Sequence, residues 1–322
     1  MALNTELLIT LQQLKGFGNK TILELSKGLT SKTIDDLCVE WTFLKGKRFV
    51  KVSESDLRKA NMCACRIIEE SNLNGIGIIS FHEELFPKNL KTCVDENGKQ
   101  NPPIVLYYRG NINALKKPGI AVIGTRKPTH MGIEAGSFFA RELAKNGFNI
   151  VSGLAIGCDT TSHEGALSVG GTTTAFLGNS LLWNDIYPQE NVELAHRIVD
   201  NGGLLLSEYP IGYMGSKFCM VARDRLQSGL SYATIVVQTD EFGGSIHAVN
   251  ATLLAKKPLY VVKYNREEEL QHSKVKGNIK FLNEGMAKPF TTQCLSENIA
   301  FLKEYVRTRD KMLSIGIKGL FD

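Results

Sequence analysis

The chain has 322 residues, of which 43% are hydrophobic and 22% are charged, and its formal net charge is +5 with a pI near 8.7. This composition is that of a globular protein and excludes a disordered chain. No window approaches the roughly 18 uninterrupted apolar residues of a membrane-spanning helix, so we expect none. The mildly positive charge is compatible with a polyanionic partner but does not identify one.

Cysteine usage and the first residues both favour a cytoplasmic protein. The seven cysteines are scattered, and the closest pair, Cys63 and Cys65, lacks the spacing of a CxxC motif. This pattern indicates free thiols in a reducing compartment and no zinc site. The first residues, MALNTELLITLQQLKG, lack the basic segment and apolar block of a secretory signal.

Residues 1–72 contain helical patterns and no convincing strand, which predicts a small all-helical domain of the helix-hairpin-helix type. Leucines and isoleucines recur at helical spacing on both sides of the turn KGFGNK, which carries Gly16 and Gly18. The amides of such a turn can hold a phosphate. The turn can also connect two helices without binding anything, and the lack of a clear second copy in the sequence favours that interpretation.

Residues 73–300 show a different hydrophobic pattern, in which short apolar runs alternate with segments of helical periodicity. Because the runs are continuously apolar, the strands are buried on both faces and helices must cover both sides. We therefore predict an α/β fold, with an extended Rossmann-like, doubly wound, mostly parallel sheet. The runs that predict strands are IGIISF, IVLYYRG, IAVIG, FNIVSG, TTAFLG, GLLLSE, ATIVVQ and PLYVVK.

The remaining segments predict one amphipathic helix and three surface elements. The helix covers 132–147 and places apolar residues at helical spacing, namely Gly136, Phe139, Ala140 and Leu143. We expect an exposed loop over 90–103 and a solvated, lysine-rich surface over 263–280. Residues 301–322 predict a short C-terminal helix or tail, too short for a further DNA-binding domain.

In a doubly wound sheet, a ligand is expected where the carboxyl ends of the strands meet. The sequence has no GxxxxGK[ST] run, and no GxGxxG followed by an acid about 20 residues later, so it predicts neither a P-loop nor an NAD or FAD site. Four loops with glycines lie at this edge instead: GTRKPTHMG, SGLAIGCDTTSH, LGNS and EFGGSIHA. Their amides and helix N-termini predict a phosphate-binding rim, to which Arg126 and Lys127 add positive charge.

The segment KFCMVARDRLQSGLS places Lys217, Arg223 and Arg225 close to Phe218 and Met220. Cations that follow phosphates, interleaved with side chains that stack on bases, are typical of single-strand binding. The same spacing also fits an amphipathic helix, with Phe218 and Met220 in the core and the arginines in water. The sequence leaves both interpretations open.

Catalysis would require an acid or base at this rim, and the candidates are Asp159, His163, Glu208, Glu241 and His247. We expect Asp159 to cap a helix and His163 to be a packed, neutral side chain. Glu208 can pair with an arginine as easily as act on a substrate. No serine, histidine and acid form a recognisable nucleophile arrangement, so we expect no catalytic residue, no metal and no cofactor.

Five motifs together resemble the DNA-processing protein A family. They are VIGTRKPTHMG, VSGLAIGCDTTSHEGAL, TAFLGNSLLWNDIYPQENVELA, GGLLLSEYPIG and RDRLQSGLS, and the similarity continues from the N-terminal helices to about residue 286. The resemblance implies a homodimer that binds single-stranded DNA without catalysis and without membrane association. It also implies loading of a RecA-type recombinase in DNA recombination and natural transformation.

The resemblance further implies where DNA is bound. Arg126 would clamp a phosphate beside the amides of its own turn. With the bases and glycines identified above, the residues expected to contact DNA or phosphate are Gly124, Thr125, Arg126, Lys127, Gly153, Lys217, Met220, Arg223, Arg225, Gly244 and Ser245.

The chain departs from the family pattern in this same region. Met220–Val221 replaces Phe-Pro, Asp224 adds a carboxylate beside the DNA path, and His247 lies in a loop without the family's threonine. Two alternatives therefore stay open. One is a nucleotide-binding enzyme or sensor of the phosphoribohydrolase-like Rossmann group, with Glu208, Glu241 and His247 as acid–base groups and a role in phage defence. The other is a protein–protein adaptor with a vestigial pocket.

Overall fold

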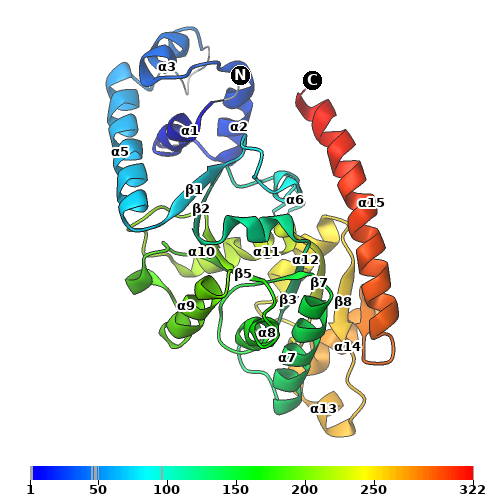
Figure 1. Ribbon diagram of the computed structural model, residues 1–322. Helices are drawn as coiled ribbons and strands as arrows, with labels where there is room; N and C mark the ends of the chain where they lie inside the picture. Colours follow the sequence, from blue (N-terminus) through cyan, green and yellow to red (C-terminus); the bar gives the residue numbers. More distant parts are fainter. Residues whose placement is uncertain (1–2, 45, 47–48, 50, 96, 322) are drawn as a thin grey trace.

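A nine-stranded sheet forms the centre of the molecule (Figure 1). The computed structural model describes residues 3–44, 46, 49, 51–95 and 97–321. The strand order is β1-β2-β6-β5-β4-β3-β7-β8-β9. The strands are β1 (Gly77–Ser80), β2 (Val105–Gly110), β3 (Gly119–Ile123), β4 (Asn149–Ser152), β5 (Thr173–Leu177), β6 (Leu204–Ser207), β7 (Ser231–Val236), β8 (Leu259–Val262) and β9 (Lys288–Phe290).

The sheet is parallel from β6 to β9, and only the pairs β1–β2 and β2–β6 are antiparallel. The chain proceeds from β3 through β4 and β5 to β6, and then returns to place β7 on the other side of β3. This reversal makes the carboxyl ends of β3 and β7 the topological switch point of the sheet. The predicted α/β, mostly parallel doubly wound fold is confirmed, and β9 is a strand that the apolar runs did not indicate.

Helices cover both faces of the sheet because successive strand residues point in opposite directions. In β3, Ile120 and Val122 belong to a core cluster with α7, while Ala121 and Ile123 belong to one with α12. The helices after β2 are α7 (His130–Lys145), α8 (Cys158–Leu167), α9 (Val192–Asp200), α10 (Lys217–Ala222), α11 (Asp224–Leu230), α12 (Ile246–Leu254), α13 (Glu267–Gln271), α14 (Lys276–Asn283) and α15 (Leu295–Phe321).

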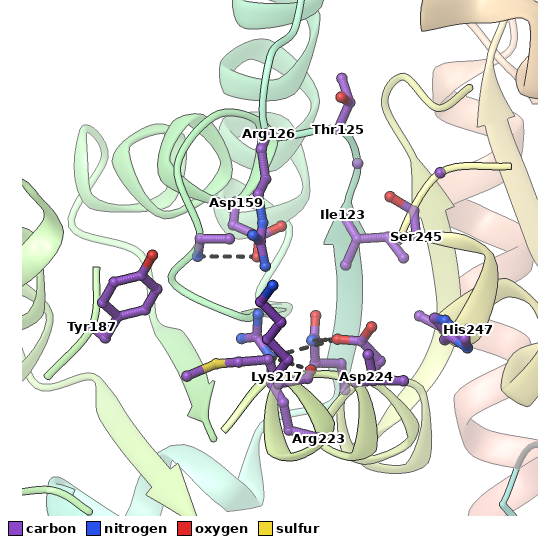
Figure 2. A pocket seen from close by; sticks show the side chains of 18 of the residues that line it. Ile123, Thr125, Arg126, Asp159, Tyr187, Lys217, Arg223, Asp224, Ser245 and His247 are labelled. Atoms are coloured by element: carbon purple, nitrogen blue, oxygen red, sulfur yellow. Dashed lines mark hydrogen bonds and ion pairs between the residues drawn. The ribbon is translucent and has the colours of Figure 1, made fainter. Parts of the chain in front are cut away.

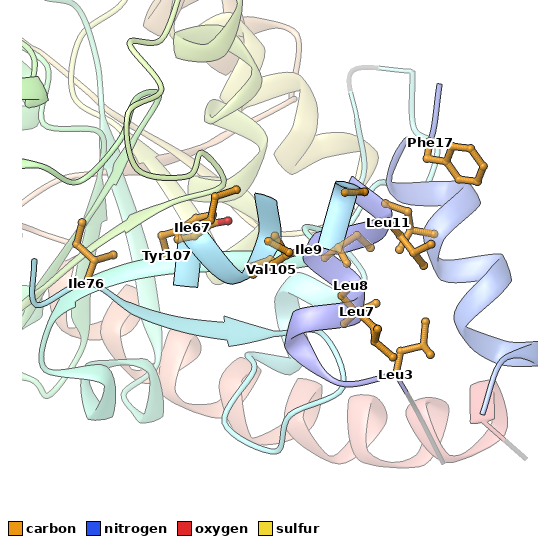
Figure 3. Packing of buried hydrophobic residues seen from close by; sticks show 14 of the residues in the cluster. Leu3, Leu7, Leu8, Ile9, Leu11, Phe17, Ile67, Ile76, Val105 and Tyr107 are labelled. Atoms are coloured by element: carbon orange, nitrogen blue, oxygen red, sulfur yellow. The ribbon is translucent and has the colours of Figure 1, made fainter. Parts of the chain in front are cut away.

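The N-terminal helices lie at one end of the sheet and share a core with it (Figures 1 and 3). They are α1 (Thr5–Gln12), α2 (Asn19–Gly28), α3 (Ile34–Trp41) and α5 (Glu54–Leu73), and the short α6 (Lys88–Lys91) follows β1. One hydrophobic cluster runs from Leu7 and Leu11 of α1 to Val105 and Tyr107 of β2. The division into domains at 72/73 and 300/301 stays a prediction.

Three surface segments can be compared with their predictions. The predicted amphipathic helix is α7, and its four apolar positions are buried. The 263–280 stretch, predicted to be a solvated, lysine-rich surface, contains α13 and α14. Its Lys263, Arg266, Lys276 and Lys280 are exposed, whereas Val275 is buried. The C-terminal helix is also longer than predicted, since α15 begins at Leu295 rather than near 301.

A buried lysine, Lys257, holds the end of α11. The Lys257 ammonium donates to the carbonyl oxygens of Ser228, Gly229 and Ser231, each at 2.7 Å. These carbonyls lie where α11 ends and β7 begins, so the ammonium satisfies acceptors that the helix leaves without partners. Burial lowers the pKa of Lys257 to about 7.

Candidate functional site

A cavity of about 860 Å³ lies at the switch point and is the candidate functional site. We call it the switch-point cavity. Its walls come from the β3–α7 turn, the β7–α12 loop, α10 with the start of α11, and the loop around Tyr187 (Figure 2). Arg223 and eight other predicted residues line it: Gly124, Thr125, Arg126, Lys127, Lys217, Met220, Gly244 and Ser245.

The β3–α7 turn is packed tightly against its neighbours, which explains the glycine at its start. A Cβ on Gly124 would lie 2.6 Å from Cys158 Sγ and 2.7 Å from the carbonyl oxygen of Gln238. The turn ends at Thr129, whose side chain caps α7 by accepting a hydrogen bond from the Gly132 amide. Only a residue without a side chain lets β3 end this close to both α8 and β7.

Gln238, two residues after the end of β7, holds this turn by hydrogen bonds on the other side. Its carbonyl oxygen accepts from the Thr125 amide at 2.7 Å, and its side-chain oxygen accepts from the Thr129 amide at 2.9 Å. Its side-chain nitrogen donates to Thr129 Oγ1 at 2.8 Å and to Glu269 of α13 at 3.2 Å. One residue therefore connects β7, the β3–α7 turn and α13.

The prediction of a rim of bare amides is wrong for much of the rim. The Thr125 amide is bonded to Gln238, and the Lys127 amide donates to Thr125 Oγ1 at 3.3 Å. The amides of Gly153 and Ala155 both donate to one carboxylate oxygen of Asp159. Positive charge for an anion must therefore come mainly from side chains.

Three exposed cations supply that charge: Arg126, Lys127 and Lys217. Within the described part of the chain, none of them is within ion-pairing distance of a carboxylate. Arg126 and Lys217 point toward each other from opposite walls in Figure 2. Two like charges that face one solvent-filled space favour an anion between them.

Lys274 is a cation of the cavity that the sequence reasoning missed. It belongs to the 263–280 stretch, which was interpreted as solvated surface. Its ammonium pairs with Asp240 at 2.7 Å, and both residues line the cavity. Because this charge is already neutralised, Lys274 adds less to the field in the cavity than Arg126 and Lys217 do.

The two arginines of the RDR motif do not act as free cations. Arg223 lines the cavity, but its guanidinium is buried and donates to the carbonyl oxygens of Gly153 and Phe176, the latter at 2.6 Å. Arg225 does not line the cavity, and it forms a buried, two-pronged ion pair with Glu208 at 2.7 and 2.8 Å. The expectation that Arg225 faces DNA is therefore corrected, because its charge is neutralised behind the cavity wall.

Gly153 lies beside the main cavity rather than in it. It lines a smaller neighbouring cavity together with Arg126, Met220 and Arg223. A Cβ on Gly153 would lie 1.8 Å from the Arg223 guanidinium, so the glycine makes room for the arginine. Gly244, in contrast, has no neighbour within 4 Å of where a Cβ would be, and it faces open space.

Asp224 is a carboxylate of the cavity whose charge state is altered by burial. Burial raises its pKa to about 7, the nearby Asp159 carboxylate acts in the same direction, and Arg223 and Arg126 oppose the shift. Asp224 accepts a hydrogen bond from Gln227 at 2.9 Å. Near neutral pH this carboxyl group is therefore divided between its neutral and charged forms.

Side chains with flat or soft surfaces surround the cations. Tyr187, Met214 and Met220 line the cavity, and Tyr187 is 56% exposed. Phe218, next to Lys217, is 87% exposed. The interpretation of α10 as an amphipathic helix with Phe218 in the core is therefore wrong. Unpaired cations and exposed rings instead occur together, as a single-strand surface requires.

The candidate catalytic groups are not brought together. His163 is fully buried with Nδ1 2.6 Å from Thr173 Oγ1, and burial lowers its pKa to about 3, so it is the packed neutral histidine that we predicted. Asp159 does not cap α8, whose N-cap is Gly157, and it holds the preceding loop instead. Of the remaining three, His247 lines the cavity and Glu208 and Glu241 do not.

Two further observations concern metals and membranes. Among the residues that the structure describes, no three His, Cys, Asp or Glu side chains are grouped so that they could hold a metal ion. In the same set, no helix combines the length and the hydropathy needed to cross a bilayer.

Comparisons with known proteins found related sequences. The chain is 35% identical over 187 residues to Protein Smf of Synechocystis sp., covering 55% of this chain and 46% of that protein. It is 32% identical over 198 residues to DNA processing protein DprA of Bacillus subtilis, covering 61% of this chain and 64% of that protein. The chain thus matches about half to two thirds of the length of these relatives.

Two solved structures are similar as well. The X-ray structure of DNA processing protein A from Streptococcus pneumoniae has the same fold, with a TM-score of 0.72 and 24% sequence identity. The matched region covers 92% of this chain and 99% of the S. pneumoniae chain. A structure of DNA processing protein A from Helicobacter pylori, which gives insight into that protein's single-stranded DNA binding mode, covers 72% of this chain and 96% of its own, with a TM-score of 0.59 and 31% identity. The family model described as DNA recombination-mediator protein A matches residues 77–300, and the chain belongs to that family.

Proposed function

We propose that this protein binds single-stranded DNA in the switch-point cavity. The observation that carries the proposal is the meeting of Arg126, Lys127 and Lys217 at the carboxyl edge of the sheet, where none of them pairs with a carboxylate of the described residues. Tyr187 and Met220 offer surfaces for base contacts beside them. Membership in the family, and the single-stranded DNA binding of the H. pylori relative, support the same ligand.

The test is a titration of fluorescently labelled oligo-dT against a duplex of equal length, followed by anisotropy across a salt series. Single-strand binding by phosphate contacts weakens with salt, with a slope of about 0.7 per contact on a double-logarithmic plot. Arg126→Ala should weaken binding and reduce that slope by about 0.7. Arg66→Ala is the matched control, because Arg66 is exposed on α5 outside the cavity. Equal affinities of the two variants would contradict the proposal.

We further propose that the protein acts without catalysis, as a homodimer that loads a RecA-type recombinase. The motif resemblance supports this role, and the scattered positions of Glu208 and Glu241 relative to the cavity remove support for a phosphoribohydrolase-like reaction. Light scattering at several concentrations measures the oligomeric state. Incubation with nucleoside monophosphates should release no base, and recombinase filaments should form faster on coated single strands when the protein is added.

A further inference from the structure

A second cavity, of about 340 Å³, lies between α2 and the segment that links β1 to β2. We call it the lysine cavity. It shares no lining residue with the switch-point cavity. Its lining residues are Lys20, Leu23, Glu24, Ser26, Lys27, Phe81, His82, Lys91, Thr92, Lys99, Gln100 and Pro102. The helix is the second one of the helix-hairpin-helix pattern, for which the switch-point cavity gives no role.

The walls of this cavity are held together by the first residue of α2. The Asn19 side chain donates to the carbonyl oxygen of Pro102 at 3.0 Å and to the side chain of Asn101 at 3.4 Å. These bonds fasten the start of α2 to the 99–102 segment. The cavity is therefore formed before any ligand arrives, which lowers the cost of binding.

Positive charge exceeds negative charge in the lysine cavity. Four lysines line it against one carboxylate, Glu24. Glu24 lies 4.0 Å from Lys20, and both side chains are largely exposed, so this pair is weak. Lys27 and Lys99 have no carboxylate within ion-pairing distance in the described ranges. The surplus charge matches a ligand with two negative charges.

Lys91 is the least solvated of these cations. Its ammonium lies 5.1 Å from the centroid of the Phe81 ring and 5.9 Å from that of Phe86. Burial lowers the pKa of Lys91, and the positive charge of Lys88 acts in the same direction. A cation that is half-buried above an aromatic ring gains from an anion that replaces its lost water.

We infer that the lysine cavity binds a nucleoside phosphomonoester, either as a free nucleotide or as the phosphorylated end of a DNA strand. Its volume is near the lower end of about 300–1,000 Å³ that small-molecule sites span. The surplus of lysines matches the phosphomonoester dianion. Leu23, Phe81 and Pro102 provide an apolar wall for the nucleoside. The inference does not depend on DNA binding in the switch-point cavity.

The test is calorimetric titration of dTMP into the Arg126→Ala protein, which weakens the switch-point cavity and so separates this inference from the proposed function. We expect saturable binding with a Kd below about 1 mM. The double change Lys27→Glu with Lys99→Glu should weaken dTMP binding at least tenfold. Lys15→Glu is the matched control, because Lys15 is exposed in the turn before α2 and does not line the cavity.

Thymidine, which lacks the phosphate, should not bind, and inorganic phosphate should bind at least tenfold more weakly than dTMP. Competition distinguishes the two sources. Displacement of dTMP by 5′-phosphorylated but not by 5′-hydroxyl oligo-dT identifies a strand end, and displacement by neither identifies a free nucleotide. Equal affinity of thymidine and dTMP, or of the double variant and Lys15→Glu, would overturn the inference. Circular dichroism of each variant verifies that it is folded.

Discussion

Asp224 should make DNA binding depend on pH in the neutral range. With a pKa of about 7, its carboxyl group is mostly neutral at pH 6 and mostly charged at pH 8. The charged form repels phosphate in the same cavity. Two unit charges at 4 Å in water interact by about 1 kcal/mol, which is roughly fivefold in affinity. We therefore expect the Kd for oligo-dT to rise about fivefold from pH 6 to pH 8.

The isosteric change Asp224→Asn isolates this effect. It removes the charge and keeps an oxygen that can accept the hydrogen bond from Gln227. Because His247 also lines the cavity, the comparison is made in a His247→Gln background. Fluorescence anisotropy with oligo-dT at several pH values and constant ionic strength measures the Kd. The variant should bind equally well at both pH values and as tightly as the parent protein does at pH 6.

Thermal stability provides a second measurement of the Asp224 charge, in the absence of DNA. A native carboxyl pKa that is raised above its unfolded value means that the folded state loses stability as pH rises from about 4 to 7. Asp224→Asn should therefore melt at a higher temperature than the parent at pH 8. If the variant retains the fivefold change in Kd and gains no thermal stability, the assignment of the titration to Asp224 is refuted.

Three further predictions concern stability. Lys257→Met should lower the free energy of unfolding by about 1–3 kcal/mol, because it leaves buried carbonyl acceptors without a donor. Urea unfolding measures this, with Lys256→Met, at an exposed position, as the control. Gly153→Ala should cost about 2–3 kcal/mol, since its Cβ would overlap the buried arginine guanidinium, whereas Gly244→Ala should cost less than about 0.5 kcal/mol. His163 stays neutral in the fold down to a pKa of about 3, so the protein should lose stability as pH falls from about 6.5 toward 3. His163→Gln should flatten that part of the curve of unfolding midpoint against pH, and an unchanged curve would contradict the assignment.

The strands of the sheet could be predicted because their burial on both faces leaves continuous apolar runs in the sequence. Strand β9 could not, since it has only three residues and its Lys288 and Pro289 are exposed. The antiparallel pairing of β1 and β2 could not be predicted either, because an apolar run does not indicate whether its neighbouring strand is parallel or antiparallel.

The position of a cavity residue could be predicted where it is set by the local sequence, and could not where it depends on a distant partner. Arg126 follows directly from a glycine turn at a strand end. The role of Arg225 is set by Glu208, which is 17 residues away in sequence and on another element. Lys274 joins the cavity through Asp240, 34 residues before it. No spacing rule indicates such pairs.

The bonds made by Gln238 have a consequence for how the switch-point cavity receives a ligand. Two of its walls, the β3–α7 turn and the β7–α12 loop, are joined by the hydrogen bonds that Gln238 makes with Thr125 and Thr129. Gln238 also donates a hydrogen bond to Glu269 of α13. Neither wall can move away from the other without breaking these hydrogen bonds. A ligand that binds between these walls would therefore meet a preformed surface, and little ordering entropy would be lost on binding.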